Sequence, residues 1–220
     1  MSIVNQIEKV KASLCTGSSR ALLYKEMVYL KSRTNLLLFA GMCILACIPG
    51  FRYITHAAAL AVVLFPFSQD IHSRWYRTCA YMPFNAADAV RVRYTVSYAV
   101  LFASVGLIEI MRAVITVLID IDDFTIDVLC VTDSLLGLSF LTAVAIPLMY
   151  IGKMKLAYYN VILTAEILLA AMGEMALSFE SAAFARHPDL TCVAAIVAVI
   201  SVVLSYRISM KMYTGSDKMI

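Results

Sequence analysis

The chain has 220 residues, of which 62% are hydrophobic and only 15% are charged, and its mean hydropathy is +0.84. A soluble domain of this length has no core large enough to bury so much apolar surface, so lipid must cover part of it. The formal net charge of +3 does not indicate a nucleic-acid partner, because the basic residues are distributed by membrane side rather than gathered in one patch.

Six apolar runs, separated by short polar links, predict an all-α, polytopic membrane protein. A helix needs about 20 residues to cross a hydrocarbon core roughly 30 Å thick. The predicted spans are residues 35–48, 53–68, 94–119, 128–150, 156–177 and 190–206. The first two are short, and only residues 49–52 separate them, so they predict a tight helical hairpin.

The basic residues predict the orientation of these spans. Of the 18 Lys and Arg residues, 15 lie in the N-terminal segment, in the links after the second and fourth spans, or in the tail. The link at residues 120–127 is acidic instead. By the positive-inside rule, both termini are expected in the cytoplasm and the acidic link outside a cell (cytoplasmic) membrane that the chain crosses several times.

Two helices are expected before the first span. Residues 1–16 have apolar side chains at helical spacing and predict an amphipathic helix lying on the cytoplasmic leaflet. Residues 17–34 predict a second, elbow-like helix, with Leu22 and Leu23 on its apolar face and Lys25 and Glu26 on its polar face. Residues 35–220 are then a single transmembrane domain.

Motifs for nucleotide hydrolysis, zinc proteolysis and serine hydrolysis are missing from the sequence, including the phosphate-binding loop, H-E-x-x-H and G-x-S-x-G. The six cysteines include no C-x-x-C pair and have no matching histidines, so structural roles are expected rather than metal binding. We therefore expect no enzyme activity and no cofactor in this chain. Any ATP-driven step requires an ATPase on another chain.

The link after the second span, residues 70–94, has the richest pattern. Trp75, Tyr76, Tyr81 and Phe84 are aromatic residues expected at the membrane surface, where an interfacial aromatic belt is the simpler interpretation. A short helix is expected to end before the turn fixed by Pro83. Asn85, two residues on, is placed to cap the next helix.

This link resembles that of small type-2 ABC exporter permeases. The pattern is an acidic residue, a tryptophan, a Leu-Pro-type turn and a Val-x-x-Arg/Lys-Tyr entry into a helix. Here it stands as Asp70, Trp75, Met82-Pro83-Phe84-Asn85 and Val90-Arg91-Val92-Arg93-Tyr94. Met82 replaces the usual leucine, and Ala86 stands where a basic residue is common. The resemblance covers residue 20 to the C-terminus and is closest to permeases that export phenol-soluble modulins or protect against antimicrobial peptides.

The resemblance implies specific partners. Two permease protomers, identical or different, would sit on two ABC ATPase subunits that bind ATP and Mg²⁺. The predicted docking residues in the link are Arg74, Trp75, Tyr76, Met82, Pro83, Phe84, Asn85 and Asp88. The elbow helix, with Leu22, Leu23, Lys25 and Glu26, would complete the docking surface.

Charged residues inside the spans are candidates for a transport pathway, because ionisable groups in the bilayer are costly and face a cavity or one another. Glu109 and Arg112 are three residues apart and can pair on one helix face. Glu166 can pair with Arg112 across the bundle or line a pathway, and Glu174 lies nearer the outer end.

The sequence therefore predicts the permease subunit of an exporter for hydrophobic or amphipathic peptides, including toxic ones. Three acids along two spans and acidic outer links favour a cationic cargo. Two alternatives stay open: the membrane-embedded substrate-binding subunit of a vitamin importer, and a non-transporting sensor or scaffold. An importer subunit is expected to lack the elbow and the long link after the second span.

Overall fold

The computed structural model describes residues 17–46, 48, 52–73, 75, 85–119, 128–151, 156–184 and 188–216, and within these ranges it contains seven helices and no strand. The helices are α2 (Gly17–Leu30), α3 (Arg33–Ala46), α4 (Arg52–His72), α6 (Ala86–Ile119), α7 (Val128–Ile151), α8 (Leu156–Phe184) and α9 (Pro188–Ser216). This confirms the predicted all-helical class. The expected amphipathic helix at residues 1–16 lies outside the described residues.

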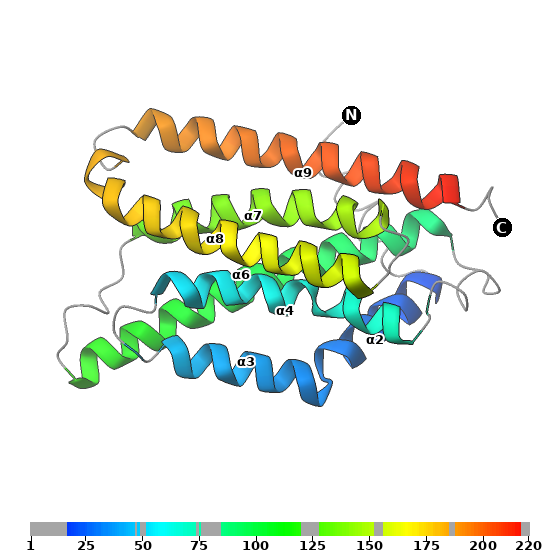
Figure 1. Cartoon of the computed structure of the whole chain (residues 1–220), viewed down its shortest axis with the longest axis horizontal. Coiled ribbons are helices and arrows are strands. Elements are labelled where there is room, and N and C mark those ends of the chain that lie inside the picture. Colours follow the sequence, from blue (N-terminus) through cyan, green and yellow to red (C-terminus); the bar gives the residue numbers. More distant parts are fainter. Residues whose placement is uncertain are drawn as a thin grey trace.

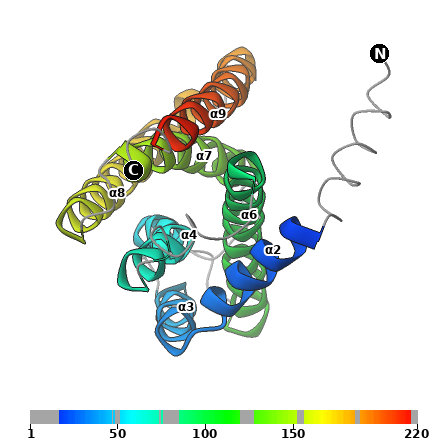
Figure 2. The same cartoon turned by 90° about the vertical axis from the view of Figure 1, so that its right-hand side faces the viewer.

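Six of the helices, α3, α4, α6, α7, α8 and α9, run lengthwise beside one another, and the short α2 lies at one end (Figure 1). We call this the α2 end; the start of α6 and the C-terminal part of α9 are also there. Viewed along the bundle, α2 crosses α6 obliquely (Figure 2). α4 packs against α3, α6 and α8, while α7 packs against α8 and α9.

Five of the six predicted spans lie within one helix each, and the first, residues 35–48, extends past the end of α3 at Ala46. Length and hydropathy together support fewer than six spans. Only Ala87–Ile115 and Cys192–Tyr213 are long and apolar enough by themselves among the described residues. Ser19–Leu30 and Arg33–Leu45 pass the same test as a pair bent by 59°. The six-span topology therefore stays a prediction, whereas α6 and α9 each contain a stretch that is long and apolar enough to cross a membrane.

The bend between α2 and α3 falls a few residues before the predicted junction at residue 34. α2 ends at Leu30, and the Lys31 amide still donates to the Met27 carbonyl at 3.0 Å. The Asn35 side-chain amide donates back to the Leu30 carbonyl at 3.2 Å. Because Asn35 is buried, this bond satisfies a helix-terminal carbonyl that would otherwise lack a partner.

Three apolar clusters hold the bundle together. The first joins α3, α4, α6, α7 and α8 in the half away from the α2 end, with Leu60, Leu101 and Ile108 fully buried. The second joins α4, α6, α7 and α8 nearer the α2 end. The third attaches α2 to α6 through Leu22, which packs against Val92 and Val96. The elbow-like helix is thus packed onto the bundle along one face.

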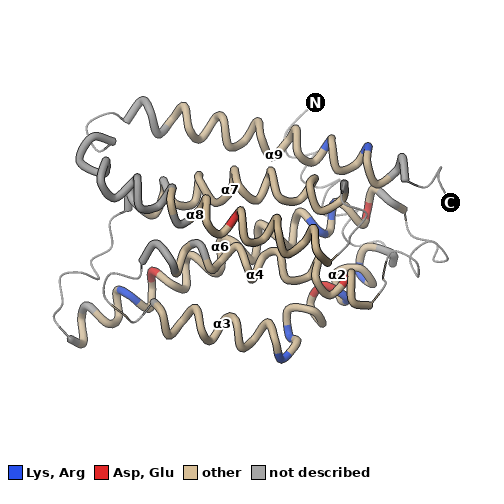
Figure 3. Tube along the Cα trace, viewed as in Figure 1, with Lys and Arg blue, Asp and Glu red and all other residues tan. Residues whose placement is uncertain are grey.

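Much of the remaining surface is apolar. Along α9, for example, Val193, Ile196, Val199 and Val203 are exposed by about half or more. Lys and Arg residues gather mainly toward the α2 end, and a long middle section of the bundle carries almost none (Figure 3). An apolar middle with a basic end is the pattern of a membrane-embedded bundle.

Candidate functional site

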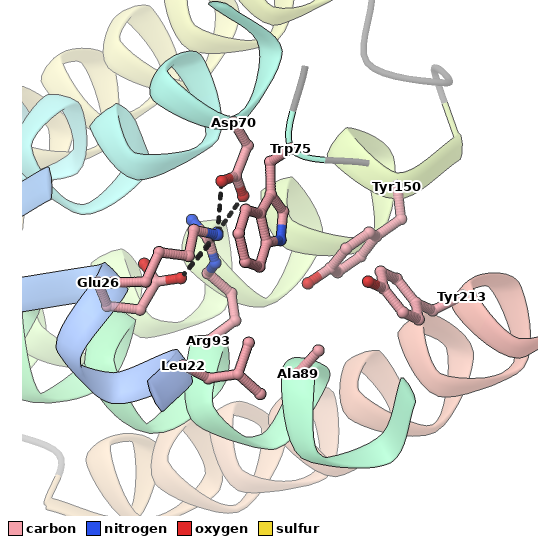
Figure 4. A pocket seen from close by; sticks show the side chains of 9 residues that line it. Leu22, Glu26, Asp70, Trp75, Ala89, Arg93, Tyr150 and Tyr213 are labelled. Carbon is pink, nitrogen blue, oxygen red and sulfur yellow. Dashed lines mark hydrogen bonds and ion pairs between the residues drawn. The ribbon is translucent and has the colours of Figure 1, made fainter. Parts of the chain in front are cut away.

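Four charged side chains from three helices meet at the α2 end. Lys25 and Glu26 come from α2, Asp70 from α4 and Arg93 from α6. Figure 4 shows Glu26, Asp70 and Arg93 converging beside the Trp75 ring, and Lys25 contacts the same ring. We call these four residues the charged cluster. They come from three separate stretches of the sequence, so only the packing of α2, α4 and α6 brings them together.

The charged cluster is an electroneutral set of ion pairs. Lys25 Nζ lies 2.5 Å from Asp70 Oδ1, and Arg93 Nη2 lies 2.9 Å from Glu26 Oε1. Arg93 Nη2 also donates to Asp70 Oδ2. Asp70, Glu26 and Arg93 are each less than 5% exposed, so each charge depends on its partners rather than on water.

Aromatic rings cover the two cations of the charged cluster. Lys25 Nζ lies 4.3 Å from the centre of the Trp75 ring and 5.0 Å from that of Tyr29. The Arg93 guanidinium lies 4.5 Å from the centre of the Phe67 ring. These distances are within the range of cation–π attraction. Burial first, and then the charge of Arg93, lower the pKa of Lys25 on the elbow-like helix, while the two acids oppose that shift.

This arrangement corrects the predicted faces of α2. The sequence predicted Lys25 and Glu26 on a polar face opposite Leu22, but Glu26 is 3% exposed and shares the buried face with Leu22. The apolar side chain of Met27, next to Glu26 in the sequence, is 50% exposed. Helical periodicity locates a face, but it cannot show that a buried acid has a basic partner on another helix.

The predicted docking residues are described only in part. Arg74, Tyr76, Met82, Pro83 and Phe84 lie outside the described residues. Trp75 is half-buried and packs against Leu22 and the neighbouring apolar side chains, so its ring belongs to the bundle as well as to the link.

The start of α6 confirms the predicted cap. The Ala87 amide donates to Asn85 Oδ1 at 3.0 Å, and the Asp88 amide donates to the Asn85 carbonyl at 2.9 Å. Asp88, in the first turn, lies 3.5 Å from Arg91. An asparagine cap followed by an acidic first turn fixes where α6 begins.

A small hollow lies beside Trp75, lined by the charged cluster and Leu22, and it extends toward α7 and α9. Tyr150 of α7 and Tyr213 of α9 line it with Ala89 of α6 and turn their hydroxyl groups inward (Figure 4). Their rings meet edge to face, with centres 5.6 Å apart. The charged cluster therefore shares this hollow with residues of α7 and α9.

A second polar contact lies toward the opposite end. His56 Nε2 of α4 is 2.8 Å from Glu109 Oε1 of α6, and both side chains are buried. We call His56 and Glu109 the outer pair. Arg112 is 2% exposed. Glu166 is 4% exposed, and its Oε2 atom has no hydrogen-bond partner among the described residues. The side chain of Glu174 lies outside the described residues.

Sequence reasoning missed several of these partners. The sequence pattern contains Asp70 and Arg93 but does not indicate their ion pair, and it gave the histidines no role except as possible metal ligands. The available signal was the presence of ionisable residues in otherwise apolar runs, because such groups are buried only with partners. No cluster of His, Cys, Asp or Glu among the described residues is arranged to hold a metal ion.

Comparison with known proteins identifies the family. The family model described as "ABC-2 family transporter protein" matches residues 21–214. No curated protein and no solved structure matched the chain. The family match spans almost all of α2 to α9, including the charged cluster and both candidate spans. The chain therefore belongs to the ABC-2 transporter family, as a membrane permease whose family implies an ABC ATPase partner.

Proposed function

We propose that this chain is the permease subunit of an ATP-driven exporter and that its α2 end is the cytoplasmic, ATPase-facing end. The observation that carries the proposal is the meeting of α2 with Trp75 and the start of α6. The predicted elbow and the predicted docking link lie on either side of α3 and α4 in the sequence, yet they share the charged cluster. A single surface at one end of the bundle can thus receive movement from an ATPase and pass it to three helices.

The burial of Trp75 changes which residues should bind the ATPase. Trp75 supports Lys25 within the protomer, so its truncation would disturb the charged cluster as well as any interface. Tyr76 and Phe84 are better candidates for the contacting side chains. Aromatic anchors of this kind typically cost about 2 kcal/mol or more of binding free energy when truncated.

The test is co-purification of the permease with its ATPase. Tyr76→Ala with Phe84→Ala should lower the amount of bound ATPase at least tenfold, while Phe102→Ala, which removes a 51% exposed aromatic from mid-α6, should leave it unchanged. Equal recovery of the ATPase from both variants would overturn the docking assignment. Trp75→Ala should in addition lower the thermal stability of the permease alone.

We further propose that two protomers assemble around a pathway for amphipathic peptides. α8 supports this through its exposed apolar side chains, which include Leu168, Leu169 and Met172. Met side chains adapt to varied apolar partners. Glu109 and Glu166, which the sequence suggested as pathway acids, are 5% and 4% exposed within a protomer, so we assign them structural roles.

Peptide-stimulated ATPase activity in proteoliposomes tests the cargo. Leu169→Ala with Met172→Ala should raise the peptide concentration needed for half-maximal stimulation at least threefold. The matched control is Val199→Ala with Leu204→Ala, which removes similarly exposed side chains from α9. If the peptide stimulates both variants identically, these α8 side chains do not line the peptide pathway. The family match favours this permease function over an importer subunit or a scaffold.

A further inference from the structure

α4 and α6 are neighbouring antiparallel helices that are joined in sequence by the docking link. Near the α2 end they are connected by Arg93 and Asp70, and toward the other end by Glu109 and His56. Between these polar contacts lies a buried apolar seam that includes Leu60, Leu101 and Ile108. Each end of the helix pair thus has its own directional contact.

The spacing of the two contacts is nearly the same on both helices. His56 and Asp70 set the spacing on α4, and Arg93 and Glu109 set it on α6. From the rise of an α-helix, about 1.5 Å per residue, the two contacts are about 21 Å apart along α4 and about 24 Å apart along α6. They therefore bracket most of a hydrocarbon core roughly 30 Å thick.

This geometry opposes sliding and splaying of the two helices. A hydrogen bond requires close approach and alignment of its groups, so a relative shift of a few ångström would break one or both contacts. Breaking either contact would remove a hydrogen bond between buried polar groups, which is costly in an apolar environment. With a polar contact at only one end, α4 and α6 could separate at the other end. Contacts at both ends fix the relative position of the two helices and the angle between them.

The connection between α6 and α9 is different. Tyr94 of α6 bonds to Ser205 at 2.5 Å and to Ser209 at 2.8 Å, close to the α2 end. Toward the opposite end of the bundle, α6 and α9 diverge (Figure 1). The two helices are thus joined near one end of the bundle and separated at the other.

We propose that α4 and α6 form a rigid helix pair, fixed at both ends, and that the outer pair keeps its far end aligned when the docking link moves. The proposal rests on the ATPase-facing role of the α2 end. Movement of the link then tilts α4 and α6 together about the α2-end contacts between α6 and α9. The far end of α6 changes its distance from α9 but not from α4.

Spin-label distance measurements on the reconstituted permease–ATPase complex test this directly. On a cysteine-free background, labels replace exposed His72 at the α2 end of α4 and Val117 at the far end of α6. A second labelled pair joins Val117 to Val193 of α9. Between nucleotide-free and ATP-trapped states, the 72–117 distance distribution should stay unchanged, and the 117–193 distribution should shift.

Variants of the outer pair test its part in the rigidity. Glu109→Ala should broaden the 72–117 distribution and lower the peptide exported per ATP hydrolysed at least threefold. Glu109→Gln, whose amide can still bond to His56, should retain at least half of that ratio. Ser104→Ala, which removes a buried hydroxyl of α6 outside the outer pair, should behave as wild type.

A shift of the 72–117 distances as large as that of the 117–193 distances would overturn the proposal. So would wild-type distances and export ratio in Glu109→Ala. If Glu109→Ala fails to assemble, two measurements still test the proposal. These are the two distance distributions of the wild type and the peptide exported per ATP hydrolysed by Glu109→Gln. Failure of the proposed function has a different result: the unlabelled wild-type permease would then not co-purify with an ATPase.

Discussion

Replacing Arg93 with methionine tests whether the charged cluster holds α2, α4 and α6 together. Arg93 is 4% exposed and contacts both Asp70 and Glu26. Methionine keeps an unbranched apolar stem but removes the charge, so two buried carboxylates would share Lys25 as their nearby cation. Removing one partner of a buried ion pair typically costs about 3–5 kcal/mol.

Arg91→Met is the matched control, because Arg91 lies two residues earlier on the same helix. Its side chain is 34% exposed and pairs with Asp88 at 3.5 Å. Exposed pairs contribute about 0–1 kcal/mol. The difference in unfolding free energy between the two variants should therefore be about 2–5 kcal/mol.

The assay is unfolding of the purified permease in detergent, followed by circular dichroism. With the scaling for chains of this length, a loss of about 3–5 kcal/mol lowers the Tm by about 6–20 °C. Adding Asp70→Asn to Arg93→Met should restore part of the loss, because it neutralises a buried carboxylate that lost one of its partners. If Arg93→Met and Arg91→Met unfold within about 1 kcal/mol of each other, the charged cluster does not stabilise the bundle.

Two further predictions follow from single contacts, and a third follows from the predicted orientation in the membrane. Tyr94→Phe should lower the unfolding free energy by about 1 kcal/mol, because the phenol loses its bonds to two serines of α9, whereas Tyr158→Phe, at a 56% exposed position, should change it little. Asn85→Ala should cost about 0.5–2 kcal/mol by removing the cap of α6, while Asn85→Gly should cost only a few tenths, as denaturant titration can measure. Cysteine labelling from outside the cell should reach position 123 and not position 86; the reverse result would contradict the orientation predicted from the basic residues.

The helices themselves were predictable from sequence. Long apolar runs interrupted by short polar links specify membrane-type helices whatever their partners, because every backbone amide in lipid must bond within its own helix. The cap at Asn85 was also readable, since capping depends on a side chain and the backbone two residues away. The family pattern around Asp70 and Trp75 indicated the permease class before the helices were placed.

The partners of the charged residues were decided only by the tertiary structure. Glu26 was predicted on a polar face because helical periodicity contains no information about Arg93, which comes from another helix. Likewise, His56 and Glu109 are 53 residues apart, and nothing local to either residue indicates their hydrogen bond. Hydropathy and local contacts determine which segments are helical, but the pairing of buried charges depends on which helix faces pack together, and that is fixed only when the whole bundle forms.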